Sequence, residues 1–346
     1  MASNTLSEHS SDTVGDFTAV EADLGSLLAG RIPLKTAHCL VDVTSQSQDE
    51  FHPITKHSVC YIVAGIVIND AGDVLFMQEA KESCRGKWYL PAGRMEPDET
   101  IIEGAKREVL EETGLEFEPD TLLCVEIGTC TWFRFTFIGH VTGGRLKTLA
   151  DSDGESLQAR WMSKVDLSNS KAYPLRAPDV MRLVMLAQNY RSRHANVRHP
   201  PLLPVINGHQ QLLMRLVITN KSGDDAFVLM NTRDVPHFPS MVLNPFIHRS
   251  MKDCFIEVLK QPFGTPTDSD NLDVVGLLSI EHHGKPQAVN DGFGITFLLS
   301  FPDNGILPKI CHKAEETYSW HKLAESELKN NLMKRLIPGM CVPAIL

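Results

Sequence analysis

Hydrophobic and polar positions along this chain follow two different periods, which separate the predicted strands from the predicted helices. A β-branched apolar run at residues 59–68 predicts a buried strand, and the turn at residues 69–72 predicts that the next run, 74–79, returns beside it. Apolar residues spaced three and four apart predict helices instead. By these two rules we expect further strands at residues 88–93, 121–131, 132–138 and 155–162, and helices at 17–30, 100–113 and 179–192.

The second part of the chain repeats this order of elements. A hairpin, a helix, two long strands, a short strand and a closing helix follow one another, at residues 213–218, 227–230, 250–261, 273–280, 292–301, 318–320 and 323–336. We interpret this part as a second, altered copy of the first. The alternative is an unrelated α+β domain whose elements have the same order by chance.

Composition and charge narrow the class of protein. A length of 346 residues favours two domains, and 42% hydrophobic residues suit ordinary folded cores. No apolar run reaches 18 residues, so we expect no membrane segment. The first 16 residues are polar and acidic, unlike a secretory signal or a mitochondrial presequence. A net charge of −10 disfavours binding to a nucleic acid.

The eight cysteines indicate a reducing compartment. None of them forms a CxxC pair, so a zinc site is not expected. Most lie beside apolar residues, as buried thiols do. We expect a cytoplasmic location, with the nucleus as a second one.

Three glutamates define the candidate chemistry. Glu108, Glu111 and Glu112 are spaced i, i+3, i+4, so on a helix they share one face within about 6 Å of each other. Like charges this close destabilise a helix by roughly 0.2–0.5 kcal/mol per pair. A bound Mg²⁺ would remove that repulsion, and it usually keeps open positions for substrate phosphates. The alternative is a solvated acidic helix face.

The helix that carries these glutamates is marked at both ends. Thr100 followed by Glu103 is the pattern of a capping box, which places the start of the helix. Gly114 is suited to the left-handed residue that ends it. The glutamates are therefore expected on a rigid, capped helix, as a catalytic site requires.

Residues 93–115, GRMEPDETIIEGAKREVLEETGL, resemble the signature of the Nudix hydrolase family at every defined position. The resemblance implies an α/β fold, a Nudix α/β/α sandwich with a mixed sheet, and metal-dependent hydrolysis of a phosphoanhydride bond. It further implies that Mg²⁺, with Mn²⁺ as an alternative, is the cofactor. The implied metal ligands are Glu108, Glu111, Glu112 and the carbonyl of Gly93, and the implied catalytic residues are Glu111, Glu112, Glu99 and Arg107, the last orienting the carboxylates.

The resemblance also sets the expected domain organisation. We expect a flexible segment at residues 1–35, a catalytic Nudix domain at 36–192, a linker at 193–204 and a non-catalytic, degenerate Nudix-like α+β domain at 205–346.

The second copy is expected to have lost the metal site. Aligning Glu257-Val258-Leu259 with Glu108-Val109-Leu110 leaves one carboxylate and places Lys260 and Gln261 where the other two glutamates stand. Binding of Mg²⁺ should then fail on charge alone. We expect this domain to support the first domain's pocket, to pack, or to form a homo-oligomer.

The substrate is expected to be a small nucleotide. The stretch from Val59 to Trp161 resembles a branch of the family that hydrolyses oxidised purine nucleoside diphosphates, such as 8-oxo-dGDP and 8-oxo-GDP, to monophosphates. Such an enzyme cleans the nucleotide pool and limits DNA damage. The candidate substrate contacts are Leu90, Arg94, Arg134, Tyr173 and Glu155.

Two alternatives stay open at this point. One is a Nudix enzyme acting on another diphosphate-linked metabolite, such as ADP-ribose or a dinucleotide. The other is a regulatory binding protein that works through its second domain.

Overall fold

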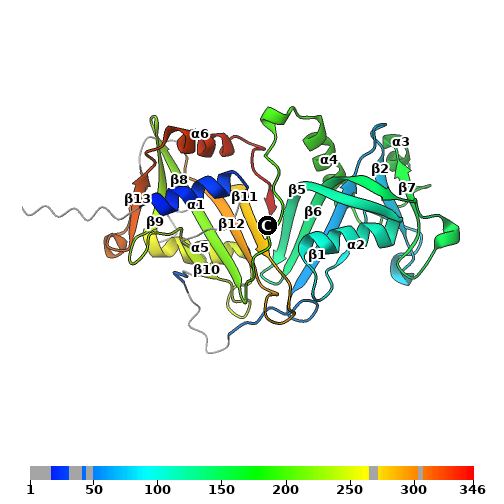
Figure 1. The fold of residues 1–346 in the computed structure, drawn as a ribbon, viewed down its shortest axis with the longest axis horizontal. Coiled ribbons are helices and arrows are strands. Elements are labelled where there is room, and N and C mark those ends of the chain that lie inside the picture. The colour runs from blue at the N-terminus through cyan, green and yellow to red at the C-terminus, as the bar shows by residue number, and fades with distance from the viewer. Residues whose placement is uncertain (1–16, 31–40, 44–49, 265–271, 303–306) are drawn as a thin grey trace, which may run out of the picture.

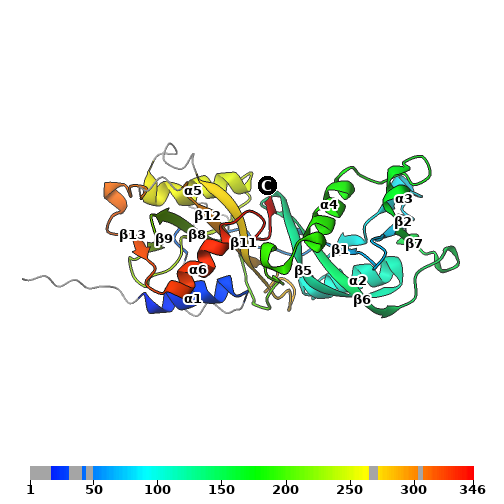
Figure 2. The same ribbon diagram turned by 90° about the horizontal axis from the view of Figure 1, so that it is seen from above.

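The computed structural model describes residues 17–30, 41–43, 50–264, 272–302 and 307–346, and places them in two adjoining halves (Figures 1 and 2). The expectations for residues 1–16 and 31–40 lie outside the described residues. Among the described helices, none combines the length and the apolar character that crossing a membrane requires.

The first half contains two sheets with helices on both sides. Its five-stranded sheet has the order β14 (Ala344–Ile345), β5 (Leu115–Thr129), β6 (Trp132–Gly144), β1 (Cys60–Val67) and β4 (Ala92–Arg94). The three-stranded sheet has the order β3 (Trp88–Tyr89), β2 (Val74–Glu79) and β7 (Ser156–Met162). The helices are α2 (Ile101–Thr113), α3 (Lys164–Ser168) and α4 (Asp179–Ser192).

Helices α2 and α4 cover opposite faces of the larger sheet. Successive side chains of a strand point to opposite faces, so neighbouring residues of β1 belong to different buried clusters. Val63 of β1 packs in one buried cluster with Val109 of α2. Its neighbour Ala64 packs in another cluster with Leu183 of α4. This is the expected α/β/α sandwich with a mixed sheet, since β1 runs parallel to β6 and antiparallel to β4.

Within its described residues, the second half contains one six-stranded sheet and three α-helices. The sheet has the order β11 (Asp273–His282), β12 (Phe293–Ser300), β8 (Leu212–Ser222), β9 (Asp225–Asn231) and β13 (Tyr318–Lys322), with β10 (Ser240–Val242) paired to β8. The helices are α1 (Thr18–Leu28), α5 (Met251–Phe263) and α6 (Ser326–Arg335).

The pairing of these strands repeats that of the first half. Strand β8 runs parallel to β12 as β1 does to β6, and β11 runs antiparallel to β12 as β5 does to β6. Strand β10 pairs β8 as β4 pairs β1, and β13 pairs β9 as β7 pairs β2. The second half is therefore a Nudix-like copy in topology as well as in element order.

The N-terminal caps of α2 and α5 show that the two copies align one residue away from the alignment expected from the sequence. Both α2 and α5 have 13 residues, and each begins after a capping box, at Thr100 and at Ser250. Superposing the caps also superposes the buried positions of the two helices residue by residue. Val258 then stands at the position of Glu108, and Pro262 at that of Glu112. The expected alignment of Glu257 with Glu108, with Lys260 and Gln261 at the other glutamates, was wrong because it ignored the cap.

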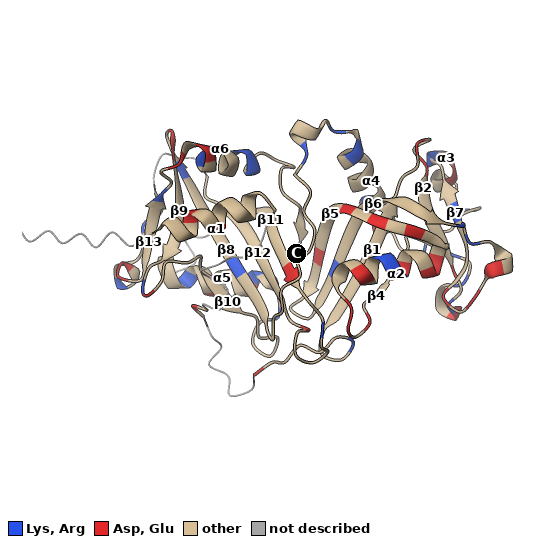
Figure 3. Ribbon diagram, viewed as in Figure 1, with Lys and Arg blue, Asp and Glu red and all other residues tan. Residues whose placement is uncertain are grey.

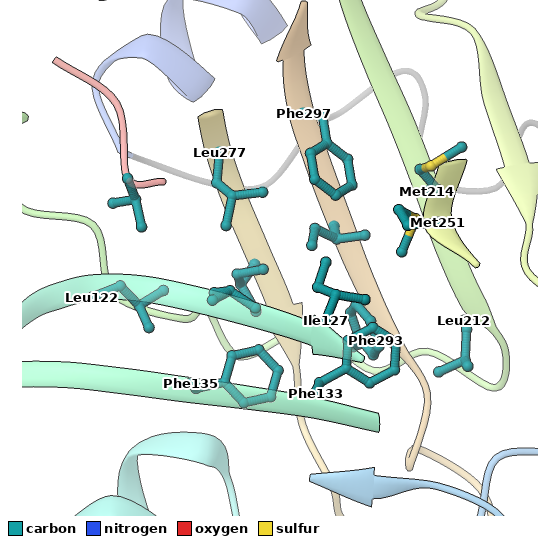
Figure 4. Packing of buried hydrophobic residues seen from close by; sticks show 14 of the residues in the cluster. Leu122, Ile127, Phe133, Phe135, Leu212, Met214, Met251, Leu277, Phe293 and Phe297 are labelled. Carbon is teal, nitrogen blue, oxygen red and sulfur yellow. The ribbon is translucent and has the colours of Figure 1, made fainter. Parts of the chain in front are cut away.

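The two halves share one hydrophobic core across the junction (Figure 4). Phe133 and Phe135 of β6 point toward Phe293 of β12, and the rings of Phe133 and Phe293 meet edge to face with centroids 4.6 Å apart. Tyr61 of β1 contacts the same Phe293 ring at 5.8 Å. Since these side chains are fully buried, separating the halves would expose a large apolar surface to water.

The two end segments of the chain do not follow the domain boundaries that we expected from the sequence. Residues 18–28 of the segment expected to be flexible form helix α1, which packs against α6 and β11 of the second half. At the other end, β14 joins the sheet of the first half by pairing with β5. The expected linker packs against strand β5 of the first half. Leu202 is buried, its carbonyl accepts the Leu122 N–H, and its own N–H donates to Thr121 Oγ1.

One local expectation also differs from the structure. The strand expected at residues 88–93 is divided between two sheets, as β3 and β4, because Pro91 lies between them and has no N–H for a ladder. The strand that carries Arg134, β6, is an inner strand of its sheet, between β5 and β1.

A buried histidine at the junction makes the fold sensitive to acid. His282 is 1% exposed, and neither ring nitrogen has a hydrogen-bond partner in the described part of the chain. Burial lowers the pKa of His282 from 6.5 to about 3, and the nearby His209 and His283 act in the same direction. The folded state therefore binds fewer protons than the unfolded chain below pH 6.5, so the free energy of unfolding falls as pH falls.

We expect His282 to contribute about 1 kcal/mol of the stability lost between pH 6.5 and 5.5. The variant His282→Leu should lose that part of the pH dependence, whereas His312→Ala, at an exposed position, should keep it. Denaturant unfolding at the two pH values measures both. Equal pH dependence in His282→Leu and the wild type would contradict this account.

Candidate active site

Helix α2 presents its three glutamates in three different environments. The expected capping box is formed, since the Glu103 N–H donates to Thr100 Oγ1 at 3.1 Å and the Thr100 N–H donates to Glu103 Oε2 at 2.7 Å. Glu108 and Glu112 are 8% and 2% exposed, whereas the Glu111 side chain is 49% exposed. The helix therefore buries two carboxylates and leaves the third about half exposed at the rim. Figure 3 marks the acidic and basic positions along α2 on the ribbon.

Arg107 connects the acidic residues of this region. Its Nε and Nη2 donate to the two oxygens of Glu99 at 3.0 and 2.8 Å. Its Nη1 donates to Glu108 at 2.8 Å and to Glu111 at 3.0 Å, and Nη2 also donates to the Arg94 carbonyl at 3.1 Å. One planar guanidinium thus fixes three carboxylates, a geometry that lysine cannot provide.

The buried carboxylates repel one another. Burial raises the pKa of Glu112 well above 4.5; a hydrogen bond from the Ala92 N–H, 2.8 Å long, opposes this, and the charges of Glu108 and Glu79 add to it. Burial likewise raises the pKa of Glu108, although Arg107 opposes it. Glu79 is 1% exposed, and its Oε2 has no hydrogen-bond partner in the described residues. This cluster carries more buried negative charge than Arg107 and its neighbours offset.

The backbone of Gly93 lies against the carboxylate of Glu108. The pairing of β4 with β1 sets Gly93 opposite Val63. A Cβ at Gly93 would lie less than 3.0 Å from the carboxylate of Glu108, so only glycine allows this approach.

A cleft of about 450 Å³ opens beside Gly93 and Glu108. Its remaining lining is rich in cationic and aromatic side chains, namely Lys56, Lys81, Tyr89, Arg94, Trp132, Arg134 and Arg176. Arg94 is exposed, and no carboxylate partner is found for its guanidinium within the described ranges. It is therefore available to an anionic ligand.

Glu155, one of the candidate substrate contacts, lines the cleft. Its carboxylate pairs with Lys81 at 3.3 Å, and both side chains are about half exposed. Burial is the largest cause of the raised pKa of Glu108, and the charges of Glu111 and Glu155 add to it. The loop that carries Glu155 is held to α2 because Lys147 donates to the Glu111 carbonyl at 3.0 Å and to Asp153 at 2.6 Å.

The opposite wall is a buried polar network around Arg134. This guanidinium donates to Glu126, to the Tyr89 hydroxyl at 2.7 Å and to Asp179 at 2.6 Å. Asp179 also accepts the Tyr89 hydroxyl at 3.2 Å, so both of these side chains hold its carboxylate. Arg176 lies over the Tyr89 ring at 4.8 Å and donates to Glu79 at 2.5 Å.

Two candidate substrate contacts lie away from the cleft. Leu90 is fully buried in the cluster beneath α4. Tyr173 packs edge-on against Trp88 with centroids 6.2 Å apart, and its face is covered by Arg160. Neither side chain lines the cleft, whereas Arg94, Arg134 and Glu155 do.

The sequence interpretation missed several residues of the site, among them Glu79, Lys81, Trp132 and Arg176. Glu79 and Lys81 come from β2 and its exit, and Arg176 from the segment before α4. Nothing local marks them, since strand pairing brings them to the cleft. A signal for Trp132 did exist, because it shares the Arg134 face of a strand whose other face is Phe133, Phe135 and Phe137.

The oxygen atoms of these residues are of the type that binds a divalent cation. Within the described ranges no three acidic, His or Cys side chains already surround a common point. The buried Glu108 and Glu112, the unpaired oxygen of Glu79 and the close backbone of Gly93 are nevertheless hard oxygen donors, the type that Mg²⁺ prefers. At the same positions the second copy has Val258 and Pro262, and neither side chain offers a donor.

Comparison with known proteins agrees with this site. Residues 61–184 match the NUDIX domain family. The 8-oxo-dGDP phosphatase NUDT18 of Homo sapiens is 38% identical over 83% of this chain and 87% of its own length, and that of Danio rerio is 32% identical over 85% and 90%. A solved structure, a NUDIX hydrolase from Nitrosomonas europaea, is 32% identical over 38% of this chain and 89% of its own, with a TM-score of 0.34.

The raised pKa of Glu112 gives a test of the metal site that does not need a substrate. The folded state holds this proton more tightly than the unfolded chain, so the ionised carboxylate destabilises the metal-free protein as pH rises above about 4.5. At pH 7.5 we therefore expect Glu112→Gln to unfold at a higher temperature than the wild type without metal. It should also lose most of the stabilisation that Mg²⁺ or Mn²⁺ gives the wild type.

Thermal unfolding with EDTA and with each metal measures both effects. The exposed Glu116→Gln is the matched control and should behave as the wild type in each condition. A Glu112→Gln variant that is destabilised without metal, yet still stabilised by Mg²⁺, would contradict the site.

Proposed function

Because this chain belongs to the Nudix hydrolase family, we propose that it hydrolyses oxidised purine nucleoside diphosphates to monophosphate and orthophosphate with the help of a divalent metal ion. The chain is a hydrolase of phosphoanhydride bonds. The substrate, the metal and the role of each residue are our proposal.

The observation that carries this proposal is the buried carboxylate pair on α2. Both carboxylates are buried; Glu108 lines the cleft together with Gly93 and several cations, and Glu112 lies close enough to Glu108 for their charges to interact. A carboxylate this deeply buried is unfavourable unless it is paired or coordinates a metal. The equivalent positions of the second copy are apolar, so the fold itself does not require charge there.

The arrangement suggests a division of roles. A metal held by Glu108, Glu112 and the Gly93 carbonyl would neutralise the oxygens of the phosphoanhydride and lower the pKa of the attacking water. Arg107 fixes the carboxylates, and Glu99 fixes Arg107. The proton of the water would pass to the buried Glu112, or to Glu111 or Glu155, whose side chains are about half exposed.

The same cleft offers contacts for the rest of the nucleotide. Arg94 and Lys81 stand at the cleft beside Glu108 and would contact the diphosphate. Trp132 lies farther along the wall with its ring near Arg134, at 6.0 Å, and would stack on the base. Base stacking on an aromatic ring contributes about 1–3 kcal/mol.

The relatives support an oxidised base and a diphosphate. Two proteins named 8-oxo-dGDP phosphatase match this chain along most of its length and most of theirs. Similarity across both halves, rather than in the signature alone, favours the same substrate class over ADP-ribose or a dinucleotide.

We also propose a cytoplasmic location. All seven cysteines in the described ranges are free, which suits a reducing compartment. Self-association through the second half stays a prediction.

The substrate proposal is tested by a small panel. The purified full chain should release orthophosphate from 8-oxo-dGDP with Mg²⁺, and should turn over 8-oxo-dGTP, dGDP and ADP-ribose at least tenfold less efficiently by kcat/KM, a difference of about 1.4 kcal/mol. EDTA should abolish the activity, and Glu108→Gln should lower kcat by orders of magnitude. ADP-ribose hydrolysed as the best substrate would overturn the substrate class but not the hydrolase.

A further inference from the structure

We propose that the second half positions the catalytic centre of the first through the loop between β11 and β12, residues 283–292, here called the brace loop. Gly284 of the brace loop and Asp98 of the first half are the positioning residues. This proposal rests on the proposed function and deepens it, because it gives the non-catalytic copy a role at the site.

The closest contact joins Gly284 to the backbone of Glu99. Gly284 adopts a φ of 74°, a conformation that favours glycine. A Cβ at this position would lie less than 3.0 Å from the carbonyl oxygen of Glu99, so the two backbones touch without room for a side chain. Glu99 is itself buried, and its carboxylate lies against Gly104 at the start of α2.

A second contact holds the preceding residue. Asp98 has a φ of 59°, in the left-handed region, and its Oδ1 accepts a hydrogen bond from the Gln287 N–H at 2.7 Å. An exposed ion pair between Lys285 and Glu103 lies nearby, but exposed pairs of this kind stabilise little. The brace loop therefore contacts two consecutive residues, Asp98 and Glu99, which lie just before helix α2.

The brace loop is anchored below these contacts in the shared core. Asp291 accepts the Thr55 N–H at 2.9 Å through its side chain and the Tyr61 hydroxyl at 2.7 Å through its carbonyl. Tyr61 is fully buried, and its own carbonyl accepts the Met95 N–H at 3.0 Å. The brace loop is thus bonded to Thr55 and Tyr61, and Tyr61 links it to Met95, the residue that follows β4.

The Arg107 side chain connects these contacts to the proposed metal ligands. The carboxylate of Glu99 receives two hydrogen bonds from Arg107, and Arg107 in turn holds Glu108 and Glu111. A displacement of the Glu99 backbone would rotate this guanidinium and move Glu108. Groups that orient metal ligands typically affect metal affinity or rate by about 10- to 100-fold.

The test compares two glycines that differ in their surroundings. Gly223, in the β8–β9 turn, has a φ of 62° and nothing within 4 Å of its Cβ position, so Gly223→Ala introduces similar backbone strain without a clash. Gly284→Ala introduces the strain and also pushes on Glu99. We expect only Gly284→Ala to lower kcat and to weaken Mn²⁺ binding, each by about 10-fold or more, with KM changed less. Mn²⁺ binding is measured by titration calorimetry, without substrate.

Asp98 provides an independent pair if Gly284→Ala does not fold. Asp98→Asn keeps an oxygen for the Gln287 N–H and tolerates the positive φ, whereas Asp98→Gly keeps only the backbone freedom. We expect Asp98→Asn to match the wild type and Asp98→Gly to show the loss of kcat and Mn²⁺ affinity.

The proposal is overturned if Gly284→Ala equals Gly223→Ala, or if Asp98→Gly equals Asp98→Asn, in both Mn²⁺ affinity and kcat. A wild type that binds Mn²⁺ but turns over no nucleoside diphosphate would instead overturn the proposed substrate. In that case the Mn²⁺ titrations alone still decide whether the brace loop positions the site.

Discussion

Burial of like charges on one face of α2 is the constraint on which the site depends. Glu108 and Glu112 are nearly inaccessible to water and lie near a third buried carboxylate, Glu79. Among the described residues, Arg107 donates to Glu108 but not to Glu112, whose carboxylate accepts the Ala92 N–H. Ionised carboxylates in such surroundings are strongly disfavoured without a counter-charge. This burial is the main support for the divalent cation that we propose at the site.

The second copy indicates that folding alone does not require these buried charges. Helix α5 reproduces the length, the capping box and the buried positions of α2, but it places Val258 and Pro262 where α2 has glutamates. Apolar residues satisfy those positions without repulsion. The second copy thus has the same packing without the two carboxylates that we propose as metal ligands, while its brace loop contacts the loop before α2. The two halves also share one core, and β14 at the chain end joins the sheet of the first half.

Sequence patterns predicted the parts of this structure that local rules determine. The caps at Thr100 and Gly114 fixed the catalytic helix, and strand periodicity located both copies. Contacts between distant segments could not be predicted in the same way. Lys81 lies at the cleft just after β2, and Arg176 lies there because its backbone bonds to that of Trp88. Tyr173 does not line the cleft, since Trp88 and Arg160 pack against its ring. Leu90 follows a strand in sequence but points into the core.

The most direct test of the account is a crystal structure of the full chain grown with Mn²⁺, with the ion located by its anomalous scattering. We predict a peak bonded to carboxylate oxygens of Glu108 and Glu112 and to the Gly93 carbonyl, at about 2.0–2.2 Å for hard oxygen ligands. A peak at an exposed acidic residue away from α2, or Glu108 and Glu112 unchanged in a crystal saturated with Mn²⁺, would contradict the account.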